Sequence, residues 1–450
     1  MRSDLLGLLR CPATGGALSL DVLERDGDHV RYGVLRSEAA EYPVLAGVPV
    51  LLPGHDESVA LVRQGLPADA AAAALVRQLD PSRLGRLAAA LEVVPGGAAP
   101  GRALARRDRH RLRAALTPLL DAAAADPFAL VRLGFSGWGG RNPEAVHYFN
   151  ARVGTPRHLV ALAAAEAAGA GGGPVLDLGC GVGHLTWWLD QRFGDGRTVG
   201  VDLSLFELWA AAGIAGGGRF VCADAAALPL AGACFGLVLS SDVLSFVAGK
   251  WAVAREAARV LAPGGTLAFA AVKSSLGRHV YAGMPLSPDG WGALAGDLPH
   301  RVFADDRVLA RYLAGLGMDG DDAGDVSTSP TVTLLAGAAH AGDGRDWGSA
   351  GEWPHACGPL GVNPLLRLVE EHDGTLVYRR RFPSPSFEAD NVPVADYLPE
   401  QVEVPRKALD GDRLDRGLVD HLVPSTAVVA MPAAYRRANL PPVGRAPGTR

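Results

Sequence analysis

The sequence has few charged residues and few cysteines. Of its 450 residues, 20% are charged and five are cysteines. An odd number of cysteines without close pairs argues against a disulfide framework and against a four-cysteine zinc site, and it favours a reducing, cytoplasmic setting. The net charge of −5 removes the sequence-wide basic field that nucleic-acid binding usually needs, so nucleic acid is not an expected partner.

Long apolar runs are also missing. No stretch reaches the roughly 18 uninterrupted apolar residues that a membrane-spanning helix needs, and the first residues hold too short an apolar run for a signal peptide. We therefore expect neither a membrane-spanning nor a secreted protein. The 57 glycines, 32 prolines and 48% hydrophobic residues are typical of a folded chain with many turns and Ala-rich helices. At this length, two or three structural units are expected.

The patterning divides the chain into four segments. Residues 1–55 alternate short apolar runs with turn signals and predict a small β-rich module, with one or two strands in 42–53. Residues 56–144 have apolar residues at helical spacing, and their basic cluster at 102–113 is more typical of a solvated helix face than of a phosphate site. Residues 145–340 repeat strand, Gly-rich turn and helix, which indicates a parallel α/β sheet. Residues 341–450 form a Pro-rich extension with one strand at 375–382.

Within 145–340 the expected elements follow from short apolar runs between turn signals. A helix is expected at 307–318, and residues 273–304 read as an insertion before it. The carboxyl ends of parallel strands are where open α/β sheets bind ligands, so the residues after each strand are the candidates for a site. The expected strands are 175–178, 198–201, 219–222, 235–240 and 265–272, followed by two closing strands at about 323–326 and 331–338.

The first of these strands leads into the most informative motif. Asp177 near the strand end precedes Gly179, Gly181 and Gly183, which are spaced two apart. Glycines let the backbone turn sharply and leave no Cβ to obstruct a ligand against the loop. A dinucleotide loop would carry its third glycine one residue later, with the pyrophosphate at the helix N-terminus. The acidic Asp177 beside this loop suits a cationic ligand better than a pyrophosphate.

These strand ends together resemble the class I S-adenosylmethionine-dependent methyltransferases. The resemblance covers residues 145–340 and implies a Rossmann-like seven-stranded α/β sheet with S-adenosylmethionine as cofactor. It implies that Asp202 accepts hydrogen bonds from both ribose hydroxyls, that Asp224 receives the adenine amino group beside the Ala225 amide, and that Ser240 lies under the methionine part. The implied cofactor-binding residues are Asp177, Gly179, Cys180, Gly181, Gly183, Asp202, Leu203, Asp224, Ala225 and Ser240, with Tyr148 on an N-terminal lid.

No catalytic base can be carried over from the family. Its common aromatic or histidine position after the fourth strand falls here in Leu244–Val247, and its acidic residue early in that strand is Gly236. Methyl transfer from a sulfonium has an activated leaving group, so alignment and water exclusion can supply much of the catalysis. His184, after the glycine turn, is expected to cap or pack. The candidate acceptor contacts are Asp242, Arg278, His279 and Tyr281.

The N-terminal module has a second resemblance. Its Leu8-Leu-Arg-Cys-Pro12 and Tyr42-Pro-Val…Gly-Val-Pro-Val50 segments are similar to the zinc-ribbon-like proteins that activate RNA and translation-factor methyltransferases. The position of the second cysteine of a Cys-x-x-Cys pair is Thr14, and no second pair follows. We therefore expect the shape of such a module without a metal.

Three functions remain open at this point. The leading one is methylation of a small molecule or short peptide, with bacterial-type secondary metabolism as its setting. The second is methylation of RNA or of a translation protein, which the N-terminal resemblance favours. The third is a non-methylating scaffold or rearrangement catalyst that binds S-adenosylmethionine, which the missing base favours. The acceptor and the oligomeric state are left open.

Overall fold

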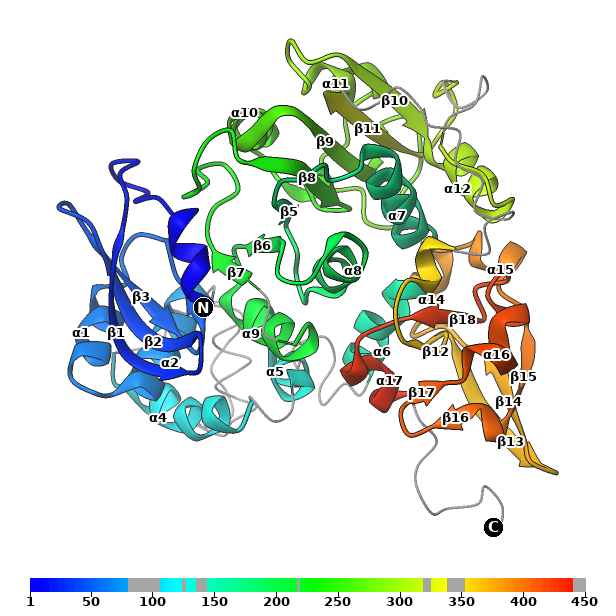
Figure 1. The fold of residues 1–450 in the computed structure, drawn as a ribbon, viewed down its shortest axis with the longest axis horizontal. Coiled ribbons are helices and arrows are strands. Elements are labelled where there is room, and N and C mark those ends of the chain that lie inside the picture. Colours follow the sequence, from blue (N-terminus) through cyan, green and yellow to red (C-terminus); the bar gives the residue numbers. More distant parts are fainter. Residues whose placement is uncertain are drawn as a thin grey trace. The chain divides into compact units, whose positions relative to one another are not determined.

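The computed structural model describes residues 1–79, 106–123, 127–134, 144–216, 219–318, 325–337 and 353–439 (Figure 1). The chain divides into two compact units. Unit 1 comprises Met1–Val146, Gly179–Thr186 and Thr198–Gly232, and unit 2 comprises His147–Leu178, Trp187–Arg197 and Ala233–Arg450. In the part of the chain that is described, none of the helices has both the length and the apolar character that crossing a bilayer requires.

A seven-stranded sheet runs through the middle of the chain, as the sequence predicts. Its strand order is β10-β11-β9-β8-β5-β6-β7. Strand β8 lies parallel to β5 and β9, and β6 lies parallel to β7, whereas β11 is antiparallel to both β9 and β10. This mixed order confirms the Rossmann-like fold. The strands are β5 (Val175–Leu178), β6 (Thr198–Asp202), β7 (Arg219–Cys222), β8 (Phe235–Ser241), β9 (Leu261–Lys273), β10 (His300–Ala304) and β11 (Thr331–Gly337).

One closing strand differs from the prediction. Of the expected strand at 323–326, the described residues Asp325 and Val326 are not in a strand, and the others lie outside the described residues. The edge position belongs instead to β10, which precedes helix α12 (Asp305–Leu313) and pairs with β11. Phe303 of β10 is buried, whereas three of the four residues at 323–326 are Ala, Gly and Asp, which have low β propensity.

The N-terminal part of unit 1 is a four-stranded antiparallel sheet in chain order, flanked by helices. The chain then leaves β4 and pairs with the last strand of the large sheet: Val50 bridges Cys222 in parallel, and the Leu51 amide donates to the Cys222 carbonyl at 2.9 Å. The elements are β1 (Ser19–Asp26), β2 (His29–Arg36), β3 (Glu41–Leu45), β4 (Val48–Pro49), α1 (Asp56–Arg63), α2 (Pro67–Gln78), α4 (Arg106–Ala123) and α5 (Pro127–Gly134). The likeness to zinc-ribbon modules stays a prediction.

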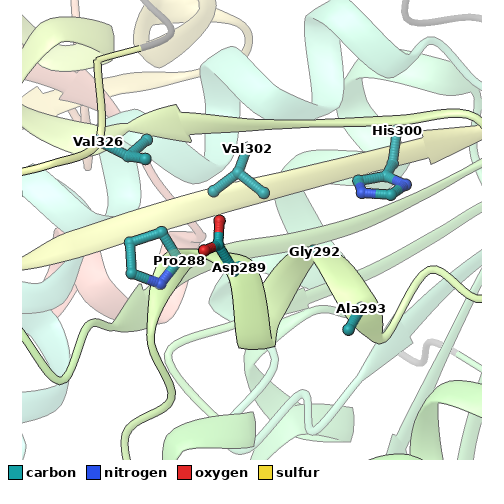
Figure 2. Close-up of a pocket in the computed structure, with 7 residues that line it drawn as sticks. All are labelled: Pro288, Asp289, Gly292, Ala293, His300, Val302 and Val326. Carbon is teal, nitrogen blue, oxygen red and sulfur yellow. The ribbon is translucent and has the colours of Figure 1, made fainter.

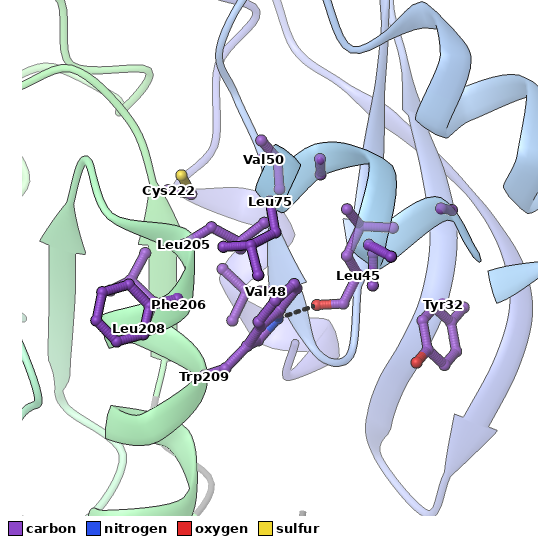
Figure 3. Close-up of a cluster of buried hydrophobic side chains, with 14 of the residues drawn as sticks. Tyr32, Leu45, Val48, Val50, Leu75, Leu205, Phe206, Leu208, Trp209 and Cys222 are labelled. Carbon is purple, nitrogen blue, oxygen red and sulfur yellow. Dashed lines mark hydrogen bonds between the residues drawn. The ribbon is translucent and has the colours of Figure 1, made fainter. Parts of the chain in front are cut away.

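One hydrophobic core joins these elements to the loops of the large sheet. Side chains of the N-terminal sheet and α2 pack with those of α9 (Leu205–Ile214) and β7 (Figure 3). Trp209 lies inside this cluster, and its Nε1 donates to the Leu45 carbonyl at 2.9 Å. Apolar burial contributes about 25 cal/mol per Å², so a shared core couples the folding of the segments that build it. Within unit 1, the N-terminal residues are therefore structural neighbours of the strand ends that the motifs mark.

Unit 2 combines the central strands with the C-terminal extension. Helix α7 (Pro156–Ala168) packs on β8, β9 and β11. The extension contains the three-stranded antiparallel sheet β13 (Leu366–His372), β14 (Thr375–Arg380) and β15 (Gln401–Pro405), in which β14 confirms the strand expected at 375–382. Trp188 Nε1 donates to the Pro354 carbonyl at 2.7 Å, and Tyr312 Oη lies 2.8 Å from His355 Nδ1. Through these buried hydrogen bonds the extension packs against the helices that carry Trp188 and Tyr312.

The remaining elements are short, and of these α6 and α8 begin in unit 1 and continue in unit 2. A two-stranded pairing of β12 with β18 and a β16–β17 hairpin complete the extension. Their bounds are α6 (Glu144–Ala151), α8 (His184–Phe193), α10 (Lys250–Val260), α11 (Pro288–Ala293), β12 (Leu360–Val362), β18 (Val428–Ala430), β16 (Leu409–Asp410), β17 (Arg413–Leu414), α14 (Pro385–Ala389), α15 (Val394–Tyr397), α16 (Arg416–Val419) and α17 (Ala433–Ala438).

Candidate functional site

The glycine turn after β5 has the backbone that the sequence predicts. Gly179, Gly181 and Gly183 have φ values of +80°, +51° and +77°, all in the left-handed region that L side chains rarely adopt. A Cβ on Gly183 would also lie 2.8 Å from the Cβ of Ala211. The turn therefore requires glycine both for its conformation and for the close approach of α9. Cys180, between these glycines, is buried.

Asp202 ends β6 and is held by the glycine turn. Its Oδ2 accepts from the Gly181 amide and its Oδ1 from the Ser204 amide, both at 2.9 Å. Burial raises the pKa of Asp202, and the amides of Ser204, Gly181 and Leu203 act against that rise. A carboxylate can accept about four hydrogen bonds, so it has acceptor capacity beyond these amides for a ribose hydroxyl. Leu203, the next residue, is 59% exposed and free to cover a flat ring.

Asp224 follows β7 and forms a tight turn. Its Oδ1 accepts from the Ala226 amide at 2.8 Å, and its carbonyl accepts from Ala227 at 3.0 Å. Such an Asx turn is the ordinary structural role of an aspartate in a loop. Asp224 is exposed and Ala225 next to it is half-buried. The Asp224 carboxylate can therefore act as an acceptor beside the backbone of Ala225. The adenine role implied by resemblance stays a prediction for these two residues.

Gln78 connects two of these loops from outside the methyltransferase-like segment. Its Oε1 accepts from the Leu205 amide at 2.9 Å, and its Nε2 donates to Cys222 Sγ at 3.1 Å. Leu205 begins α9 shortly after Asp202, and Cys222 ends β7 two residues before Asp224. Burial raises the pKa of the Cys222 thiol to about 12, so the sulfur stays neutral. No sequence motif marks Gln78, because its partners are 127 and 144 residues away.

In unit 2, the predicted residues lie in and just after the central strands. Asp177 in β5 is 2% exposed and Ser240 in β8 is fully buried. Among the described residues, Ser240 Oγ has no hydrogen-bond partner. An orphaned buried hydroxyl is uncommon and fits a position that a polar ligand group completes. Asp242, directly beyond β8, has a φ of +57°, an uncommon conformation for a residue other than glycine.

Two arginines that sequence reasoning missed hold Asp242. Arg152 Nη2 lies 3.0 Å from Asp242 Oδ2, and Arg157 Nε lies 3.7 Å from Asp242 Oδ1. Arg157 Nη1 also pairs with Asp390 at 2.7 Å. Tyr148, the predicted lid residue, accepts from Arg152 Nη1 at 3.3 Å. The available signal was the four-residue spacing from Tyr148 to Arg152, which places both on one helical face.

The other acceptor candidates lie on the loop after β9. Arg278 is exposed, and Tyr281 is 54% exposed. His279 Nε2 lies 2.9 Å from the Ser274 carbonyl, which fixes the ring against its own loop. Lys273, the last residue of β9, donates from Nζ to the Tyr281 carbonyl. The structure therefore ties this loop to the carboxyl end of β9. His184 is the first residue of α8, and its expected role in capping or packing stays a prediction.

A separate hollow of 330 Å³ lies between α11 and β10 (Figure 2). None of its lining residues is one of the predicted site residues. In the described ranges, no three His, Cys, Asp or Glu side chains come together as a metal site would require. The lining residues are Pro288, Asp289, Gly292, Ala293, His300, Val302 and Val326.

Comparison with known proteins identifies the class. A family model described as a methyltransferase domain matches residues 176–269. Two proteins named malonyl-[acyl-carrier protein] O-methyltransferase, from Enterobacter lignolyticus and Pseudescherichia vulneris, are each 30% identical to this chain; the matches cover 38% and 31% of this chain, and 67% and 52% of those proteins. A trans-aconitate 2-methyltransferase from Paracidovorax citrulli is 38% identical over 21% of this chain and 36% of its own length.

The fold, the glycine turn and these relatives agree. The chain belongs to the class I S-adenosylmethionine-dependent methyltransferases, and S-adenosylmethionine is its cofactor. The matched segment, 176–269, contains the glycine turn, Asp202, Asp224, Ser240 and Asp242. It does not contain Gln78, Arg152 or Arg157, so these belong to the parts of the chain that the family model leaves out.

Proposed function

We propose that this protein transfers the methyl group of S-adenosylmethionine to a small molecule or a short peptide in the cytoplasm, in biosynthesis of the secondary-metabolic type. The observation that carries this proposal is the compact charged cluster of Arg152, Arg157 and Asp242 just beyond β8. Ligands of open α/β sheets bind at such strand ends. A cluster of this size matches one charged group of a small acceptor better than the extended backbone of a nucleic acid.

The relatives support a small acceptor. Two are named for a malonyl group on a carrier protein and one for trans-aconitate. The malonyl group and trans-aconitate are both derived from carboxylic acids. The chain spans 52% of the length of the first of these relatives, so their acceptors serve here as a guide to chemical class.

We assign two groups of residues to cofactor binding. In the first group, which includes the turn of Gly179, Gly181 and Gly183, Asp202 would accept from the ribose hydroxyls. Asp224 and Ala225 would contact the edge of the adenine ring. Asp177, Ser240 and Tyr148 would serve the methionine end. S-adenosylmethionine, when bound, supplies a methyl group already activated on a sulfonium. The residues of this chain then need only to orient the acceptor and exclude water.

We also propose a division of labour among the segments. Residues 145–340 form the methyltransferase domain, residues 1–55 a zinc-ribbon-like module without metal, and 56–144 a helical support. Residues 341–450 complete the unit that carries Arg152, since Asp390 from this extension pairs with Arg157. Deleting the extension should therefore cost activity as well as stability.

A single-turnover assay tests the proposal. Protein loaded with methyl-labelled S-adenosylmethionine is mixed with pools of organic acids, short peptides and total RNA. Label in an acid or peptide supports the proposal, whereas label in RNA overturns it in favour of nucleic-acid methylation. Label in no pool would favour a non-methylating protein.

The basic cluster at 102–113 gives little support to RNA binding. Within its described part, Arg113 pairs with Glu57 at 2.8 Å and contacts Asp69 at 3.5 Å, so it serves the fold.

A further inference from the structure

The loop that follows β9 exposes several large apolar side chains in a short stretch. Leu276, Val280, Tyr281 and Met284 lie close together in the sequence, and each is between 44% and 54% exposed. Single exposed apolar side chains are normal on a protein surface, whereas a group of them marks a place where another molecule binds. These four residues and Phe246 form the apolar rim.

Phe246 lies beside this loop and is 49% exposed. The Met284 amide donates to the Ser245 carbonyl at 2.7 Å, and a Cβ on Gly283 would lie 3.0 Å from Phe246 Cδ1. Phe246 ends the short 3-10 helix η3 (Leu244–Phe246), which follows β8. The loop after β9 therefore meets the turn after β8 at the carboxyl ends of both strands, the edge where open α/β sheets bind ligands.

Hydrogen bonds hold the loop in this position. The Ser275 amide donates to the Leu286 carbonyl at 2.8 Å and closes the base of the loop. Lys273 Nζ donates to the Tyr281 carbonyl and lies 4.4 Å from the centre of the Phe246 ring. These bonds use the backbone of the loop and leave its apolar side chains exposed. A surface that is already ordered binds a ligand at a smaller entropic cost.

The size and charge of the rim restrict what it can bind. Five half-exposed side chains offer roughly 400 Å² of apolar surface, whereas a stable protein–protein interface buries about 800 Å² on each partner. Residues 274–287 contain no Asp or Glu, and the exposed Arg278 is their one permanently charged side chain. The rim therefore suits a small apolar body with an anionic group better than a cationic ligand or a second protein.

We propose that the apolar rim binds the hydrocarbon body of the methyl acceptor, so that the acceptor is an acid with an apolar chain or ring. This inference rests on the proposed function and narrows its class of small molecules. The location supports it, because η3 follows directly on the strand end that carries Asp242. An apolar surface at that edge lies where the acceptor of an open α/β sheet is expected.

Titrations followed by ligand NMR test the rim in the full-length protein saturated with S-adenosylhomocysteine. The probes are hexanoate, octanoate and decanoate, which share a carboxylate and differ only in their methylenes. We expect the dissociation constant to fall by about twofold to fourfold for each added methylene, since full burial of one gives about fourfold. Octylammonium should bind more weakly than octanoate, because the loop offers no carboxylate.

Variants locate the binding. Leu276→Ser and Met284→Ser shorten exposed side chains of the rim, and each should weaken decanoate binding by about threefold or more. Val392→Ser is the matched control, because Val392 is 65% exposed on the extension and lies outside the rim; it should keep the affinities of the parent. With S-adenosylmethionine bound instead, nuclear Overhauser effects between octanoate and the transferable methyl should place the chain beside that methyl.

Equal affinities for the three acids overturn the proposal, as do rim variants that bind decanoate like the parent. Tighter binding of octylammonium than of octanoate, or octanoate that binds without contact to the transferable methyl, also overturns it. A parent dimer that Leu276→Ser dissociates would assign the rim to a second copy of the chain. Sedimentation with phosphatidylglycerol vesicles that Leu276→Ser abolishes would assign it to a membrane surface. Both results replace the acceptor as the occupant.

Failure of the proposed function would appear differently. In that case the acids keep their dependence on chain length and on Leu276, but no methyl label reaches any acid or peptide in the single-turnover assay. If the inference alone fails, label reaches a small acceptor while the affinities for the three acids do not depend on chain length.

Discussion

Gln78→Met removes one amide that joins the start of α9 to the end of β7. Leu205 is the first residue of α9, so its N–H has no partner within the helix. The preceding residue, Ser204, makes no side-chain cap. Gln78 Oε1 takes the place of that cap at 2.9 Å. Methionine has nearly the same length and volume, so the substitution removes hydrogen bonds without opening a cavity.

The size of the effect follows from capping. Loss of a helix cap costs about 0.5–2 kcal/mol, and the N–H to sulfur bond to Cys222 adds about 0.5 kcal/mol at the low end of net hydrogen-bond values. We expect the free energy of unfolding to fall by about 1–2.5 kcal/mol. Because Ser204, next to Leu205, holds Asp202 Oδ1, we expect the dissociation constant of S-adenosylmethionine to rise by about three- to tenfold, or about 0.6–1.4 kcal/mol.

Urea unfolding and calorimetric titration measure the two quantities separately. Gln401→Met is the control, because Gln401 is exposed on β15 and its Oε1 accepts from Arg379 Nε at 3.2 Å. That variant should change the free energy of unfolding by no more than about 0.5 kcal/mol. Parent-like affinity in Gln78→Met, measured where both proteins are folded, would show that Gln78 serves stability alone and would refute its positioning role.

Three further predictions test other parts of the structure. Asp202→Ala should weaken S-adenosylmethionine binding by about 1–3 kcal/mol, the cost of leaving hydrogen-bonding groups unpaired; equal calorimetric affinities would contradict the ribose assignment. Trp209→Phe loses the bond from Nε1 to the Leu45 carbonyl and should lower the free energy of unfolding by about 0.5–1.5 kcal/mol in urea titrations. Burial raises the pKa of Asp305 from 3.8 to about 7, so the folded state binds the extra proton and stability should decrease from pH 4 to 7. Asp305→Asn should flatten that decrease relative to the parent, and identical slopes would show that the carboxyl does not titrate in this way.

The strands and the glycine turn could be predicted because their signals are local. The strand limits 175–178 and 219–222 agree with β5 and β7, since a short apolar run between turn residues is enough to mark a buried parallel strand. The spacing of Gly179, Gly181 and Gly183 likewise records a backbone requirement that lies within five residues. The closing edge was harder to predict. Local β propensity does not say which segment packs against β11, so it could not decide between β10 and residues 323–326.

The supports of the site escaped prediction for the same physical reason. Arg152 meets Asp242 across 90 residues, and Gln78 meets Cys222 across 144. Neither residue type is unusual in a helix, and apart from the four-residue spacing between Tyr148 and Arg152 the surrounding sequence does not separate them from solvated neighbours. Only folding assigns them: Gln78 caps α9 because Ser204 does not, and Arg152 pairs with Asp242 because the fold brings the residue after α6 to the carboxyl end of β8. A sequence motif therefore identifies the residues expected to face the cofactor. The residues that hold these motif residues in position can be found only among their tertiary contacts.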